Sequence, residues 1–82
     1  MLTAEVRVTY KKNVSDPQGL TVKHALESLG YRNLKEVRIG KLITVKLDAK
    51  NGKAAERDVK KMCRELLANP VVEDYSFEIR SE

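Results

Sequence analysis

The sequence predicts an α+β fold of the ferredoxin-like type, a two-layer sandwich with two helices on one face of a four-stranded antiparallel sheet. Two segments show the apolar spacing of helices, and four short segments show the alternation of strands. Their order along the chain is β-α-β-β-α-β, which with right-handed crossovers folds most simply as a split βαβ sandwich. Residues 1–82 are expected to form one domain.

The first strand is predicted over residues 2–10, where apolar and polar side chains alternate. A helix should follow, because Asp16 can cap its first N–H groups and Pro17 suits its first position. Gly30 is a natural stop, since glycine accepts a positive φ. The apolar side chains of this helix recur at i, i+3, i+4 and i+7 and should be buried: Val22, Ala25, Leu26 and Leu29.

The middle of the chain predicts a β-hairpin. Val37 and Ile39 form one short alternation, residues 43–47 form a second, and Gly40 with Lys41 between them suggests a tight reversal. One long bent strand would show the same pattern, so both readings stay open. The two inner strands of the sheet should be the first and the third.

The second helix is predicted after the turn at Asn51 and Gly52, and the residue before Pro70 should end it. Glu56 and Lys60 have the spacing of a favourable i, i+4 ion pair. The apolar stripe of this helix comprises Ala55, Val59, Met62, Cys63 and Leu66. Residues 71–80 alternate again and predict the last strand.

Charge and composition argue against some classes of function. The 16 basic and 12 acidic residues give a net charge of +4 but are interspersed, without an extended basic arm. RNA-binding domains of this fold carry aromatic residues on the open face of the central strands. The sequence has Glu5, Arg7, Thr44 and Lys46 there, which argues against nucleic acid as a partner. No apolar run is long enough to span a membrane, and a cytoplasmic location is expected.

The sequence offers no catalytic or metal-binding set. His24 is the only histidine and lies outside the apolar stripe, and the only cysteine, Cys63, lies within the stripe of the second helix. Metal-ligand spacing and phosphate-binding glycine loops are absent. We therefore expect no catalytic residue, no metal site and no cofactor bound by this chain.

Two segments are only partly explained by local structure: Asp16–Gly19 and Val37–Lys41. The predicted fold also leaves one polar sheet face uncovered and two strand edges unpaired, which favours self-association or docking.

These two segments, together with Ala25–Leu26, Leu29–Gly30, Cys63 and Leu66–Tyr75, resemble the PurS family in order and spacing over essentially the whole chain. That family is the small subunit of phosphoribosylformylglycinamidine synthase, a ligase of purine biosynthesis that depends on ATP and glutamine.

The resemblance implies a non-catalytic structural subunit that is inactive in isolation. It would bridge a glutaminase subunit and a large synthetase subunit, assist ammonia transfer between them, and form dimers or tetramers. ATP and Mg would bind to the partner. Contacts to partners or to a second copy are expected at Asp16, Pro17, Gln18, Gly19, Arg38, Gly40 and Lys41. The alternative is a stand-alone regulatory or small-molecule-binding domain, because this fold carries many unrelated functions.

Overall fold

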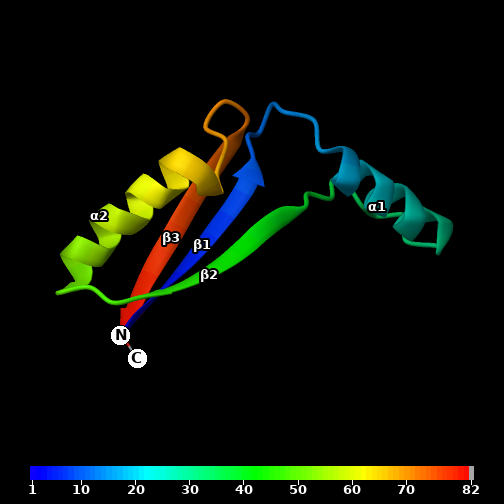
Figure 1. Cartoon of the computed structure of the whole chain (residues 1–82). Helices are drawn as coiled ribbons and strands as arrows, with labels where there is room; N and C mark the ends of the chain where they lie inside the picture. The colour runs from blue at the N-terminus through cyan, green and yellow to red at the C-terminus, as the bar shows by residue number, and fades with distance from the viewer. Residues whose placement is uncertain (82) are drawn as a thin grey trace.

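The computed structural model describes residues 1–81 as an α+β fold around a three-stranded antiparallel sheet. The strand order is β2-β1-β3, with β1 in the centre. Figure 1 shows α2 lying along one face of the sheet, whereas α1 projects beyond one end of it. The elements are β1 (Leu2–Tyr10), α1 (Pro17–Ser28), β2 (Gly40–Leu47), α2 (Gly52–Met62), the π-helical turn η1 (Cys63–Leu67) and β3 (Glu73–Ser81).

The core lies between β1 and the helix α2 with its continuation η1. The alternation predicted for the first strand is confirmed, because Ala4, Val6 and Val8 are fully or almost fully buried. From the helix, Val59 and Cys63 pack against them. Tyr75, Phe77 and Ile79 of β3 and Ile43, Val45 and Leu47 of β2 surround this cluster but are only partly buried.

The end of the second helix departs from the predicted stripe. The N–H of Ala68 donates to the carbonyl of Cys63 at 3.0 Å, an i→i+5 bond that fits one extra residue into the turn. The extra residue moves the position that faces the core by one residue along the chain. Leu67 therefore packs on the core, whereas Leu66 is 84% exposed. The prediction of a buried Leu66 is therefore wrong, because it assumed an unbroken 3.6-residue period. The Glu56–Lys60 ion pair is also not formed among residues 1–81.

The prediction of four strands is wrong as well. Val37 and Ile39 are not part of a strand, and Gly40 and Lys41 do not reverse the chain. They begin β2, where Gly40 lies opposite Thr9 and Lys41 opposite Val8 of β1. Without the expected second strand, β2 becomes an edge of the sheet.

The first helix begins as predicted but packs differently. Asp16 caps α1, Pro17 occupies its first turn and Gly30 has a φ of 104°. Its apolar stripe, however, is not buried: Val22 is 37% exposed and Leu29 75% exposed. We call α1 and the extended segment that returns from it, residues 16–39, the arm.

The arm makes the molecule elongated. The Cα radius of gyration is 16.2 Å, whereas a compact domain of this length would have about 12 Å. The expected sandwich with both helices on one face is thus only half formed, because α2 alone covers the sheet (Figure 1).

The shift at η1 predicts a clear difference between two adjacent leucines. Leu67→Ala should lower the free energy of unfolding by about 1–3 kcal/mol, since it removes apolar atoms from the core. Leu66→Ala should change it by less than about 0.5 kcal/mol. Urea unfolding of both variants measures this, and equal effects would contradict the assigned turn.

Candidate functional site

All seven residues predicted to make functional contacts lie where the arm meets the sheet. They belong to two segments, Asp16–Gly19 and Val37–Lys41, which we call the joint. The first opens α1 and the second leads from the arm into β2. The structure therefore brings together two regions that lie about 20 residues apart in the sequence.

Asp16 closes the joint. One of its carboxylate oxygens accepts from the N–H of Gly19 at 2.9 Å, and the other accepts from the N–H of Ile39 at 2.7 Å. Asp16 is only 5% exposed. The bonds from Ile39 and Gly19 outweigh the effect of burial and hold the pKa of this carboxyl below its usual value. The Asp16 carboxylate thus connects the start of α1 to the end of the segment that returns from it.

Gly19 allows these two segments to approach closely. A Cβ atom at this position would lie 2.1 Å from the carbonyl oxygen of Val37. Only glycine leaves enough room for that backbone contact, so this position is set by packing rather than by an unusual φ.

Arg38 ties the joint to the end of β1. Its guanidinium donates to the carbonyl of Lys11 at 2.8 Å, with a longer contact of 3.5 Å to the carbonyl of Tyr10. Its Nε atom also lies 3.5 Å from a carboxylate oxygen of Glu36. Much of the hydrogen-bonding capacity of Arg38 is therefore used within the chain.

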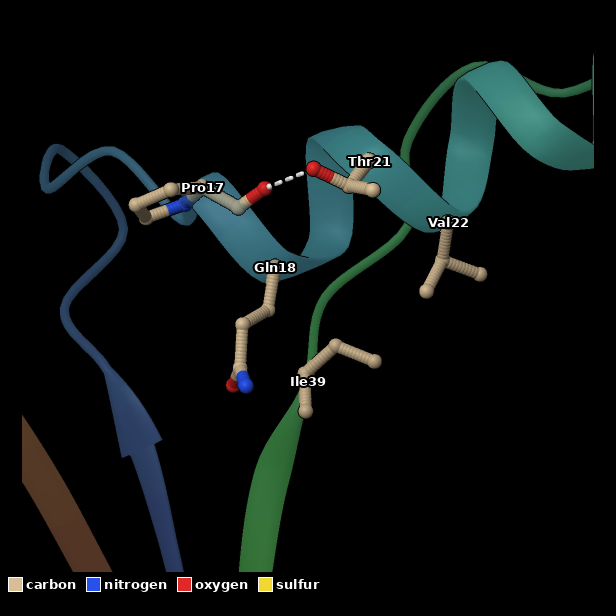
Figure 2. Close-up of a pocket in the computed structure, with 5 residues that line it drawn as sticks. All are labelled: Pro17, Gln18, Thr21, Val22 and Ile39. Carbon is tan, nitrogen blue, oxygen red and sulfur yellow. Dashed lines mark hydrogen bonds between the residues drawn. The ribbon is translucent and has the colours of Figure 1, made fainter.

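The remaining joint residues line two hollows. The larger, of about 410 Å³, is bordered by Pro17, Gln18, Thr21, Val22 and Ile39. Figure 2 shows Gln18 and Val22 pointing from α1 to the side on which Ile39 lies. Gly40 and Lys41 line a smaller neighbouring hollow together with Gln18. The joint presents a surface of mixed polarity.

The joint contains no nucleophile with an adjacent base. His24 is exposed on α1, and Cys63 lies in the core, where burial raises the pKa of its thiol. Within residues 1–81, no three His, Cys, Asp or Glu residues gather in a way that could hold a metal ion. Neither of the helices described is long and apolar enough to cross a membrane.

Comparison with known proteins identifies the family. Residues 3–81 match the family model PurS, described as phosphoribosylformylglycinamidine (FGAM) synthase. The chain belongs to the PurS family. The PurS subunit of this synthase from Methanocaldococcus jannaschii is 39% identical over 79 residues, which cover 96% of this chain and 95% of that protein. The corresponding subunit from Bacillus subtilis is 43% identical, with 96% and 93% covered.

Solved structures of PurS proteins share the fold. The crystal structure of M. jannaschii PurS, described as one of the subunits of formylglycinamide ribonucleotide amidotransferase, has a TM-score of 0.90 at 38% identity. The match covers 100% of this chain and 99% of the M. jannaschii chain. A chain of the PurLQS structure from Thermotoga maritima has a TM-score of 0.85 at 38% identity, with 98% and 99% covered.

The close approach at Gly19 predicts opposite effects of alanine at two helical glycines. Gly19→Ala should destabilise the joint by about 1–3 kcal/mol, because its Cβ would push the Val37 carbonyl away. It should also speed hydrogen exchange of the Ile39 amide. Gly52→Ala is the matched control, since nothing lies within 4 Å of its added Cβ, and it should stabilise by about 0.4–1 kcal/mol. Slow exchange at Ile39 in the Gly19 variant would contradict the assigned contact.

Proposed function

We propose that this chain is a non-catalytic subunit of a phosphoribosylformylglycinamidine synthase complex, where it bridges a glutaminase subunit and an ATP-dependent synthetase subunit. One observation carries the proposal. The match to PurS subunits extends over nearly the full length of both chains, including a chain of the PurLQS structure. In this role residues 1–82 act as a single PurS-like domain in the cytoplasm.

The chemistry of the reaction explains what such a subunit contributes. Ammonia released from glutamine is protonated in water and then no longer reacts as a nucleophile. Its transfer therefore needs a closed route between the glutaminase and the synthetase. A bridging subunit helps to form that route with fixed surfaces, whereas ATP and Mg bind to the synthetase.

The joint is our proposed contact region for these partners. Pro17, Gln18, Gly40 and Lys41 are exposed there and form a rim of mixed polarity. Asp16, Gly19 and Arg38 hold the rim in shape through the bonds within the chain. Arg38 is thus assigned a positioning role, and Lys41 the more direct contact.

Self-association also follows from the surface that the arm leaves open. The accessible surface is 6328 Å², about 1,300 Å² more than expected for a folded monomer of this mass. A standard protein interface buries about 800 Å² per partner. The excess is therefore large enough to be the interface of a stable dimer.

Two apolar surfaces fit this dimer. One is the inner face of β2, where Ile43, Val45 and Leu47 are only partly covered because α2 packs on β1 and β3. The other is the exposed stripe of α1, including Val22 and Leu29. We propose that α1 of a second copy covers the β2 side of the sheet, and the reverse.

The proposed dimer predicts that Leu29→Asp weakens self-association at least tenfold, because it introduces a charge into a buried apolar contact. Leu42→Asp is the control: Leu42 is also exposed, at 61%, but it alternates with Ile43 and so lies on the opposite sheet face. Analytical ultracentrifugation measures both. Dissociation caused by the Leu42 change alone would contradict this arrangement.

Reconstitution tests the function and separates it from a stand-alone regulatory domain. Glutamine-dependent synthesis by the glutaminase and synthetase of the same organism should require this chain. Synthesis from added ammonia should depend on it far less, because ammonia in solution bypasses the transfer. The Lys41→Glu variant should restore less glutamine-dependent activity than the wild-type chain.

If the two large subunits use glutamine equally well without this chain, the proposed role is wrong. A small molecule that raises the melting temperature of the isolated chain, with no partner needed, would then favour the regulatory alternative.

A further inference from the structure

The solvent face of α2 and η1 carries an uninterrupted row of cations. Lys53, Arg57, Lys60 and Arg64 follow at i, i+4, i+7 and i+11, a spacing that places them along one side of the helix. All four are exposed, and they lie away from the side on which Ala55 and Val59 are buried. We call these four residues the basic stripe. It spans about 16 Å at the rise of an α-helix.

The basic stripe differs from the other charged surfaces because its charges are not neutralised. On the open sheet face, Arg7 pairs with Glu78 at 3.8 Å, and Arg80 pairs with Glu5. On α1, Lys23 lies 4.0 Å from Glu27. By contrast, none of the four stripe residues forms an ion pair within residues 1–81.

Helix stability explains only part of the stripe. Lys53 and Arg57 are a like-charged i, i+4 pair, as are Lys60 and Arg64, and such pairs destabilise a helix. Lys53 also lies in the first turn, which contains no acidic residue, so its charge opposes the helix dipole. Lys60 in the last turn of α2 and Arg64 in the last turn of η1 are favoured by that dipole, and Glu56 lies at i, i+4 to Lys60. The two like-charged pairs remain unfavourable in the isolated chain, and an anionic surface against them would remove the repulsion.

We infer that the basic stripe docks a carboxylate-rich surface of another protein subunit of the complex. The inference rests on the proposed function and adds the chemistry of one partner contact. Charges of this kind guide association at protein interfaces.

The surroundings favour a protein over nucleic acid. Residues 52–67 contain no aromatic side chain on which a base could stack. Glu56, Asp58 and Glu65 lie on the same helical segment and would repel a continuous phosphate backbone. A protein surface can instead place its carboxylates opposite the stripe alone.

The stripe remains available in the proposed dimer. It lies on the side of α2 that faces away from the core, whereas α1 of the second copy would cover β2. Docking at the stripe and self-association through the arm therefore use different surfaces of the chain.

The test compares two double variants with the same change in net charge. Arg57→Glu with Lys60→Glu reverses the centre of the stripe. Lys11→Glu with Lys12→Glu reverses two cations outside the arm that also lack an ion pair within the described chain and lie far from α2 in the sequence. Circular dichroism and ultracentrifugation establish that each variant keeps its fold and its self-association. Titration calorimetry with the glutaminase and synthetase subunits then measures binding.

The stripe variant should bind the other subunits at least tenfold more weakly, while the control binds like the wild type. Wild-type affinity should also fall as salt rises, and less so in the stripe variant. If the stripe variant binds the other subunits as tightly as the wild type does, the inference is wrong and the proposed function stays intact. Equal weakening by both double variants overturns the inference too, because net charge would then be the cause. Salt-sensitive retention on single-stranded DNA that only the stripe variant loses would assign the stripe to nucleic acid.

Discussion

The pairing of β1 with β2 fixes where the arm must start and finish. Because Gly40 lies opposite Thr9, the chain leaves the sheet and returns to it at the same end. Everything between these strands is one long connection, and the Asp16 carboxylate closes its base by binding the N–H groups of Gly19 and Ile39. The arm projects beyond the end of the sheet (Figure 1). Its apolar stripe is therefore not buried by its own core.

The sequence predicts the local elements well because local chemistry determines them. The alternation of Ala4, Val6 and Val8, the cap at Asp16 and the stop at Gly30 all act within a few residues, and the structure confirms each. The packing of α1 is different in kind. An apolar stripe says that a helix surface is to be covered, but it does not say whether the cover comes from the same chain. The fourth strand was predicted wrongly for the same reason. Val37 and Ile39 alternate, but two alternating residues fit an extended segment beside a helix equally well.

In the candidate site, too, the residues were predicted from the sequence but their contacts with distant residues were not. The seven residues do meet at one place, and they were recognisable in the sequence as polar or backbone-special positions in segments that resemble the PurS family. The second partner of Asp16 was missed, because this bond spans 23 residues and its donor is a backbone N–H that carries no sequence signal. The contacts of Arg38 with the carbonyls of Tyr10 and Lys11 were also not predicted, since they have no local pattern. Leu66 was misplaced because one i→i+5 bond shifts the register of a helix that is otherwise regular.

An 82-residue chain whose sheet is covered by one helix has a thin core, and the proposed association would bury more of its apolar surface. Binding to the folded form then adds to its stability. The three surfaces that the structure leaves incomplete lie in different places: the arm with the inner face of β2, the rim of the joint, and the outer side of α2. A chain that exposes them separately can engage several partners at once. The hydrogen bonds of Asp16 and Arg38 at the joint connect the arm to the sheet, and the proposed bridge between two subunits needs such a connection between the surfaces that contact its partners.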